Sequence, residues 1–352
     1  MKLAIIGSVG VPASYGGFET LVEYLIDSDD HDFTVYCSKQ HYSKHPETYK
    51  GTKLIYIGLP ANGPLSIVYD IFSILHAIFT GQRNLLILGV SGAIIFPIIR
   101  LFAPFITIVT NIDGIEWRRE KWGGVARRLL KIFEYLAVKC SHTIVSDNDA
   151  ISSYVKREYG VKSKTIAYGG EHAVDVLPSD ETVNSLNLNY SFGLAVCRIE
   201  RENNCHTILD GFSNSSKNII FIGNWHASAY GRALKIKYAA FPNIRMLDPE
   251  YDIQKLYLYR KSCQFYIHGH SAGGTNPSLV EIMHFSKQII AFDCNFNRET
   301  LEGLGSYFSD SHQLVKIINE MKDSLDLSVK EVATRRYTWE IVRQQYFSLF
   351  ME

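Results

Sequence analysis

The sequence predicts an α/β protein with two domains, each built on a parallel sheet. Its 352 residues are enough for two domains of roughly 150 residues each. The chain opens with an apolar run at residues 3–6, a glycine-rich loop, apolar side chains at helical spacing over residues 18–26, and a second apolar run at residues 33–37. This order of strand, helix and strand is typical of an α/β domain, and it starts again at residues 192–196.

Composition and charge exclude several classes of protein. Lysine and arginine number 36, equal to aspartate and glutamate, so the global basic field expected of a nucleic-acid-binding protein is missing. The six cysteines include no CxxC pair, which indicates small buried side chains in a reducing compartment. The N-terminal apolar run is too short for a signal peptide, and no segment supplies the ~20 apolar residues of a membrane span. We therefore expect a cytoplasmic protein.

Apolar runs continue through the first half of the chain. Strands are expected at residues 54–57, 85–88, 107–110 and 143–146. Residues 65–79 form a strongly apolar helical pattern, and residues 93–105 are apolar but interrupted by prolines. Burial against the sheet is the ordinary explanation for such segments. Contact of part of this surface with lipid is the alternative.

Two polar loops follow strands in this half. Gly16, Gly17 and Glu19 come after the first strand, and Asp113 opens a loop after the strand at residues 107–110. Ligand-binding side chains of α/β domains lie at the carboxyl ends of strands, and glycine lets the backbone approach a ligand closely. The alternatives are a structural turn at the two glycines and an N-cap or Asx-turn at Asp113.

A basic and aromatic segment follows Asp113. It holds Glu116, Trp117, Arg118, Arg119, Lys121, Trp122, Arg127, Arg128 and Lys131. A basic helix with tryptophans suits an anionic membrane surface or a pyrophosphate headgroup. A solvated helix face is the plain alternative.

The second half contains the most informative stretch of the chain. An apolar strand at residues 264–267 leads into a loop with Gly273 and Gly274, then Pro277 and Glu281. A strand, a glycine-rich turn and a helix N-terminus favour anion binding, and proline suits the first helical turn. Glu281 falls about one turn into the helix, where it could accept hydrogen bonds from ligand hydroxyls. The alternative is a plain turn followed by a solvated glutamate.

Residues 269–281 resemble the nucleotide-sugar loop of GT-B glycosyltransferases of family 4. More narrowly, they resemble the bacterial rhamnosyltransferases of capsule and cell-wall polysaccharide assembly, as do residues 16–19, 113–122 and 292–299. The resemblance implies two Rossmann-like domains that face a cleft whose closure excludes water. Residues 1–171 would form an acceptor-binding domain and residues 172–335 a nucleotide-sugar-binding domain. Residues 336–352 would form a C-terminal helix that crosses back to the first domain.

The chain departs from the family pattern at two positions. Family 4 carries two glutamates separated by seven residues; Glu281 matches the second, which binds the ribose hydroxyls, but the first falls on Gly273. The contact to the donor sugar would then shift to backbone amides of the loop. Arg198 matches the arginine that neutralises the donor diphosphate, whereas the family's lysine position is Asn203. Candidates for the missing positive charge are Arg118, Arg232 and Lys235.

The resemblance implies a metal-independent, retaining glycosyltransferase without a cofactor. The donor would be dTDP-L-rhamnose, and the acceptor a saccharide on polyprenyl diphosphate at the cytoplasmic face of the inner membrane. The sequence contains no HExxH metal motif. The implied catalytic residues are Asp113, Arg198 and Glu281. The implied donor-binding residues are Gly16, Gly17, Arg198, Asn203, Gly273, Gly274, Thr275, Asn276 and Glu281. The implied acceptor-binding residues are Glu19, Asp113, Glu116, Trp117 and Arg118.

Two other functions remain open at this point. The departures at Gly273 and Asn203 are compatible with an inactive GT-B scaffold or sensor. A nucleotide-sugar epimerase shares the GT-B fold and is the second alternative. His172, in the passage between the domains, could line the cleft or be merely structural.

Overall fold

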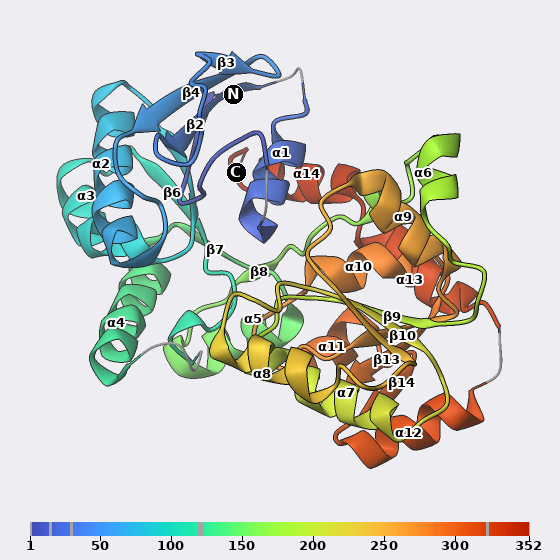
Figure 1. The fold of residues 1–352 in the computed structure, drawn as a ribbon. Coiled ribbons are helices and arrows are strands. Elements are labelled where there is room, and N and C mark those ends of the chain that lie inside the picture. The colour runs from blue at the N-terminus through green and yellow to red at the C-terminus, as the bar shows by residue number, and fades with distance from the viewer. Residues whose placement is uncertain (1, 14–15, 29–30, 119–122, 322–323, 352) are drawn as a thin grey trace. The chain divides into compact units, whose positions relative to one another are not determined.

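The computed structural model describes residues 2–13, 16–28, 31–118, 123–321 and 324–351. The chain divides into two compact units (Figure 1). Unit 1 comprises Met1–Tyr168 and Trp339–Glu352, and unit 2 comprises Gly169–Thr338. Each unit holds its own largely parallel sheet, which confirms the predicted α/β class.

Unit 1 is built on an eight-stranded sheet in the order β3-β4-β2-β1-β5-β6-β7-β8. The strands are β1 (Lys2–Ile6), β2 (Asp32–Ser38), β3 (Thr48–Tyr49), β4 (Thr52–Ile57), β5 (Asn84–Leu88), β6 (Thr107–Asn111), β7 (Thr143–Ser146) and β8 (Lys164–Thr165). Short β3 pairs antiparallel with β4, and the other recorded pairings are parallel. The carboxyl ends of β1, β5 and β6 therefore share one edge of the sheet.

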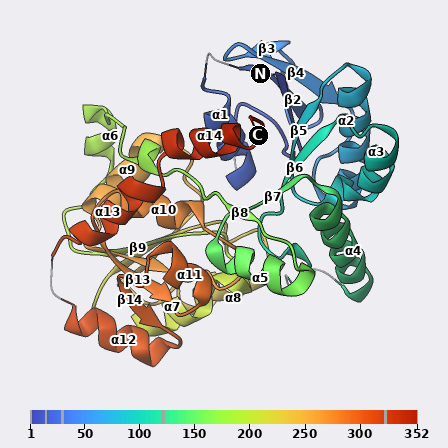
Figure 2. The ribbon, with the colours of Figure 1, turned by 180° about the vertical axis from the view of Figure 1, so that it is seen from behind.

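Helices cover the faces of this sheet (Figures 1 and 2). They are α1 (Gly17–Leu25), η1 (Gly63–Leu65), α2 (Ser66–Phe79), η2 (Ser91–Ile95), α3 (Phe96–Phe102), η3 (Glu116–Arg118), α4 (Gly124–Cys140), α5 (Asp149–Tyr159) and α14 (Trp339–Ser348). The C-terminal helix α14 packs in unit 1, and the Trp339 ring stacks on Tyr24 with centroids 4.5 Å apart. The expected burial of α2 and α3 is only partial, because one side of each helix stays exposed.

Unit 2 holds a six-stranded parallel sheet in the order β11-β10-β9-β12-β13-β14. Its strands are β9 (Gly193–Val196), β10 (Ile219–Ile222), β11 (Ile244–Leu247), β12 (Phe265–His268), β13 (Gln288–Phe292) and β14 (Ser306–Phe308). Its helices are η4 (Glu171–Ala173), α6 (Asp180–Ser185), η5 (Arg201–Asn203), α7 (Cys205–Ser213), α8 (Ala229–Lys237), α9 (Ile253–Ser262), α10 (Pro277–Met283), α11 (Asn295–Thr300), α12 (Ser311–Glu320) and α13 (Leu327–Arg336).

Alternation along β12 separates the two faces of this sheet. Phe265 and Ile267 join a buried core that includes side chains of α7, α8 and α12. Tyr266 and His268 therefore point to the other face, which α9, α10 and α13 cover (Figure 1). This arrangement places α10 directly above the strand that carries the glycine-rich loop.

The last helix begins later than residue 336, where the sequence places it. Helix α13 ends at Arg336, and α14 begins at Trp339. The break falls at Tyr337, whose carbonyl accepts hydrogen bonds from the Gly170 backbone amide and from His284 Nε2. The Tyr337 carbonyl therefore does not take part in helical hydrogen bonding. The same two bonds hold the chain in place where it leaves unit 2.

Candidate functional site

The predicted donor-binding residues of the second domain gather at the carboxyl edge of the unit 2 sheet. Arg198 lies just beyond β9, and residues 269–276 form the loop after β12, which is the neighbour of β9. Glu281 lies on α10, which follows that loop. Parallel strands bring their carboxyl ends to one edge, so these segments share a common site.

Hydrogen bonds hold the two loops together. Asn203 Nδ2 donates to the Arg198 carbonyl at 2.7 Å, and Asn203 Oδ1 lies 2.8 Å from His270 Nδ1. Asn204 donates to the carbonyl of Gly269 at 2.8 Å. The Asn203 side chain is therefore buried and bonded at both ends, which makes it a brace between the loops. A lysine at this position could not make the same two bonds, since it has no acceptor.

Glu281 is a largely buried carboxylate with cationic partners. Its Oε2 pairs with Arg260 on α9, and its Oε1 lies 3.3 Å from His172 Nε2. Burial alone would raise the pKa of Glu281, but the Arg260 guanidinium and the His172 imidazole outweigh it and lower the pKa. The group therefore stays ionised at neutral pH and can accept hydrogen bonds.

Arg260 was not predicted as a site residue. The side chain is 9% exposed, and the pair it forms with Glu281 joins α9 to α10. Its signal in the sequence is weak: none of the positions three or four residues away is acidic, so no partner lies on its own helix. His172 reaches Glu281 because Gly170 lies against the α10 backbone, where a Cβ would meet the Val280 carbonyl at 2.7 Å.

Backbone geometry explains why glycine replaces the family glutamate at position 273. Gly273 has φ +113°, a conformation that L side chains rarely adopt. A Cβ there would also lie 3.0 Å from His270 Nε2. The loop in its present form therefore excludes a glutamate at this position.

The N-terminus of α10 is already capped. Pro277 is at the start of the helix as predicted, and the Asn276 side chain accepts the Ser278 backbone amide at 3.0 Å. The backbone amides of Leu279 and Val280 bond to the Asn276 carbonyl. Because these donors are engaged and α10 has only seven residues, an anion at this edge would depend on the loop amides and on Arg198 more than on the helix end.

Arg198 is accessible to a ligand. Its side chain is 43% exposed and lies 3.8 Å from Glu200, a distance that leaves the guanidinium weakly held. Of the candidates for an additional cation, Arg232 donates to the His226 carbonyl at 2.8 Å and Lys235 pairs with Asp248 at 3.1 Å. Arg118 lies in unit 1.

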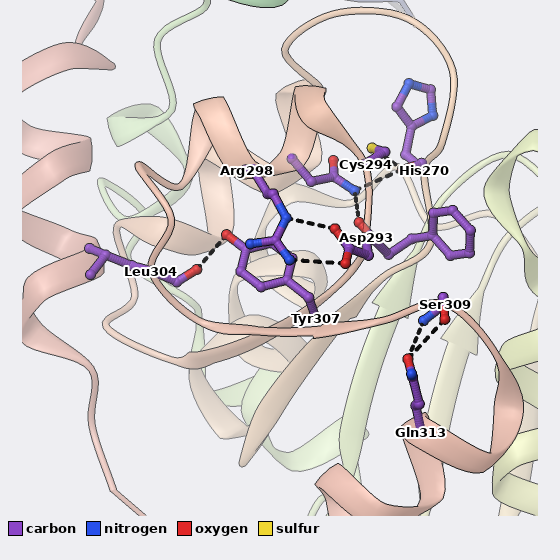
Figure 3. A network of polar contacts seen from close by, with 10 residues as sticks. His270, Asp293, Cys294, Arg298, Leu304, Tyr307, Ser309 and Gln313 are labelled. Atoms are coloured by element: carbon purple, nitrogen blue, oxygen red, sulfur yellow. Dashed lines mark hydrogen bonds and ion pairs between the residues drawn. The ribbon is translucent and has the colours of Figure 1, made fainter.

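A polar network supports the glycine-rich loop from the side of β13 (Figure 3). Asn297 Nδ2 donates to the His270 carbonyl at 2.8 Å. On the same helix, Arg298 forms a two-bond pair with Asp293 at 2.6 and 2.9 Å, and its guanidinium stacks 4.2 Å above the Tyr307 ring. The polar segment at residues 292–299 is thereby engaged in bracing the site.

His268, the last residue of β12, is buried and its Nε2 has no hydrogen-bond partner. Burial lowers the pKa of His268 to about 3, so the ring is neutral at physiological pH. His268 was not predicted as a site residue.

In unit 1, the loop after β1 is closed by Glu19. Glu19 Oε1 accepts the Val9 backbone amide at 2.8 Å, and the side chain is only 8% exposed. Burial raises the pKa of Glu19 above its ordinary value despite this bond. Gly16 has φ +130°, and Gly17 is the first residue of α1. A Cβ at Gly16 would collide with the Glu19 carboxyl, so glycine is required there.

Asp113 follows β6 at the same edge of the unit 1 sheet. Its backbone has φ +58°, and its amide donates to Asn111 Oδ1 at 2.8 Å. The turn is thus closed by the Asn111 side chain, which also donates to Tyr346 Oη at 2.6 Å. Asp113 is close enough to Glu19 to raise the pKa of that carboxyl. The structure therefore brings these two predicted acceptor residues into one neighbourhood.

The basic and aromatic segment begins with η3. Trp117 Nε1 donates to Tyr154 Oη at 3.2 Å, and the Arg118 guanidinium stacks 5.1 Å from the Trp117 ring. Glu116 precedes them and is partly exposed. Arg119, Lys121 and Trp122 lie outside the described residues. Trp117 is thus held by hydrogen bonds to side chains of α4 and α5.

The described residues hold neither a metal-binding cluster nor a membrane-spanning helix. No group of three or more His, Cys, Asp or Glu side chains among them is placed to hold a metal ion. Within the same part of the chain, no helix combines the length and apolarity needed to cross a membrane.

Comparison with known proteins establishes the fold. A family described as a domain of unknown function (DUF1972) matches residues 1–171. No curated protein sequence matches the chain. Sucrose-phosphate synthase from Thermosynechococcus elongatus is 14% identical, with a TM-score of 0.82 over 99% of this chain and 98% of that one. Anabaena HepE in complex with UDP-glucose is 15% identical, with a TM-score of 0.72 over 100% and 99%.

A third solved structure agrees. The α,α-trehalose 6-phosphate synthase from Burkholderia multivorans is 10% identical, with a TM-score of 0.72 over 99% of this chain and 97% of that one. These neighbours are GT-B glycosyltransferases. The chain therefore has the GT-B fold, as predicted from the resemblance.

Proposed function

We propose that this chain is a glycosyltransferase that takes its sugar from a nucleotide diphosphate sugar bound in unit 2. One observation carries the proposal: an ionised, cation-paired Glu281 and an accessible Arg198 lie at the carboxyl edge of one parallel sheet. The GT-B fold supports it, and so does the neighbour HepE, whose structure holds UDP-glucose.

The two groups have complementary tasks in this proposal. Glu281 accepts hydrogen bonds from the pentose hydroxyls, because each of its oxygens keeps an acceptor site beyond the one that faces Arg260 or His172. A deoxyribose retains its 3′ hydroxyl and so remains a suitable ligand. Arg198 and the amides of Gly273, Gly274 and Thr275 stabilise the diphosphate as it leaves.

The finer assignment is dTDP-L-rhamnose as donor and a saccharide on polyprenyl diphosphate as acceptor, in surface polysaccharide synthesis. The sequence resemblance of residues 269–281 and 113–118 supports it. Transfer proceeds with retention and without metal, and the leaving phosphate takes the acceptor proton. Asp113 then orients the acceptor hydroxyl, with Glu116, Trp117 and Arg118 beside it in unit 1.

The test is a panel of nucleotide sugars, scored by thermal shift and by radiolabel transfer to a lipid-linked saccharide. Glu281→Gln keeps the shape of the side chain. Arg198→Ala truncates an exposed side chain. Each should cost about 2–4 kcal/mol of transition-state stabilisation, or a factor of about 30 to 1,000 in kcat/KM. The matched control is Arg335→Ala, which removes an exposed guanidinium paired with Glu302 in the same unit.

The outcomes separate this proposal from its rivals. Near-normal turnover in both site variants contradicts the proposed site. Nucleotide-sugar binding without transfer or hydrolysis in any assay favours an inactive scaffold. Release of a free epimerised sugar without acceptor favours an epimerase.

A further inference from the structure

Helix α2 presents a row of apolar side chains to solvent, while two polar side chains are buried beside Tyr69, Ile74 and Ala77 on its inner side. Asp70 is 3% exposed and Ser73 is fully buried, whereas Phe79 is 86% exposed. The exposed apolar residues repeat every three or four positions and form one continuous row: Leu65, Val68, Phe72, Leu75 and Phe79. A surface helix of a water-soluble protein normally exposes charged and polar side chains on its outer side.

The next helical segment repeats this arrangement. Across η2, α3 and the turn that follows, the exposed row is Ile94, Ile98, Leu101, Phe102 and Phe105. Leu101 is 72% exposed and Phe102 is 77% exposed. Segment η2 packs against α2 and against α4, and α3 packs against α4, so the helical segments that carry these rows are neighbours (Figure 1).

Helix α4 adds a third row and a basic border. Its exposed apolar residues are Val125, Leu129 and Ile132. On the side of α5 lies an open hollow of about 730 Å³. Its lining is Arg128, Lys131, Ile132, Tyr135, Lys139, Glu158 and Tyr159. We call the three apolar rows together the outer apolar face.

This face concentrates the exposed hydrophobic surface of unit 1. Among the described residues of that unit, every exposed large hydrophobic side chain except Met351 belongs to the outer apolar face or to Tyr135 at its border. Contiguous exposed apolar surface of this kind marks a site of interaction with another molecule or with a membrane.

The segments that carry the outer apolar face expose charges of one sign, whereas Glu158 of α5 lies in the lining of the hollow and pairs with Lys131 at 2.7 Å. Within residues 63–105 and 124–140, the acidic residues are Asp70 and Glu134, and both side chains are buried. The basic residues of the same ranges are Arg83, Arg100, Arg127, Arg128, Lys131 and Lys139, all exposed. The whole chain has a formal net charge of zero, so positive charge is segregated to this region.

We propose that the outer apolar face docks on a lipid bilayer that contains anionic lipids, with α2, α3 and α4 lying in the interface plane. The apolar rows enter the boundary between headgroups and acyl chains, and the basic border pairs with lipid phosphates. A second copy of the chain fits less well, because two such faces would bring like charges together. The docking does not depend on the proposed transfer reaction.

The test is flotation of the purified chain with vesicles. Phosphatidylcholine vesicles with and without phosphatidylglycerol are compared at low salt and at about 0.5 M salt. The chain should float with the anionic vesicles at low salt. The double variant Phe79→Glu with Leu101→Glu should lower the bound fraction at least tenfold. Arg83→Gln with Arg128→Gln should lower binding to anionic vesicles and reduce its salt dependence.

The matched control places the same charges elsewhere. Leu177 and Ile236 of unit 2 are 96% and 79% exposed, and Leu177→Glu with Ile236→Glu should float like the parent chain. Nucleotide binding should be unchanged in all these variants, which separates failure of the docking from failure of the proposed function. Absence of flotation at low salt would overturn the proposal. A dimer that the Phe79→Glu and Leu101→Glu variant dissociates, without flotation of the parent, would assign the face to a second copy instead.

Discussion

Buried carboxyl groups are treated in opposite ways by the two units. In unit 2, Arg260 and His172 face Glu281, and they lower its pKa in spite of burial. In unit 1, burial prevails and raises the pKa of both Asp70 and Glu134. A backbone amide bonds to Asp70, and tyrosine hydroxyls bond to Glu134. One unit keeps its buried carboxyl charged, and the other favours the protonated form.

The difference in pKa helps to distinguish carboxyl groups that bind a ligand from carboxyl groups that only support the fold. A buried ion pair gains little net stability, because the desolvation of both charges offsets their attraction. Stability alone therefore does not explain why Glu281 is kept ionised at the edge of the sheet. A ligand that needs a hydrogen-bond acceptor explains it better. Carboxyl groups with raised pKa values join helices to their neighbours. By this criterion Glu19, whose pKa is also raised, acts mainly on the shape of its loop.

The largest expected effect comes from removing the cation of unit 2. Arg260→Met leaves Glu281 buried with only His172 beside it, and breaking a buried pair on one side costs about 3 kcal/mol or more. We expect the free energy of unfolding, measured by urea titration at pH 7, to fall by that amount. The loss should shrink toward pH 4, because Glu281 can then take a proton.

The double variant Arg260→Met with Glu281→Leu provides the control. It removes both charges, so its stability should return to within about 1 kcal/mol of the parent. If the single and double variants lose the same stability, the cost comes from packing of α9 and not from the unpaired charge.

Local pattern was enough to predict the framework of the molecule. Apart from the short strands β3 and β14, the strands and the loop at residues 269–276 were predicted, because apolar runs and glycines act over a few neighbouring positions. Glu281 was predicted through the family resemblance. Its partner Arg260 was not, since the two are separated by 21 positions and meet only when α9 packs beside α10.

The exposed rows of unit 1 show a different limit. The pattern at residues 65–79 correctly predicts a helix, but apolar residues occur on all its sides, so periodicity does not decide which side faces the sheet. Burial of Asp70 and Ser73 settles the orientation, and that depends on contacts with distant residues such as Gly92. The φ value of Gly273 was likewise not predictable from its neighbours.

A smaller effect should follow from neutralising the buried carboxyl of α2. The folded chain keeps a proton on Asp70 at pH values where the unfolded chain has released it, so stability present near pH 4 is lost as pH rises. Asp70→Asn removes this loss. Between pH 5 and pH 7, the variant should gain on the order of 1–2 kcal/mol relative to the parent in urea unfolding. A stability difference that does not change with pH would show that Asp70 ionises normally.

The smallest effect is expected at Glu134. Burial raises its pKa, but hydrogen bonds from Tyr154, Tyr159 and Trp117 partly offset the shift. Glu134→Gln keeps an oxygen that can accept these bonds and removes the ionisation. The sign is the same as for Asp70→Asn: the variant should gain stability relative to the parent as pH rises from 5 to 7, by less than about 1 kcal/mol. Thermal unfolding across this range measures it, with Glu158→Gln as the reference, because Glu158 is a surface carboxylate whose pKa Lys131 lowers. If the Glu134→Gln variant instead lost stability relative to the parent as pH rises, Glu134 would be, like Glu281, a carboxylate that the fold keeps charged.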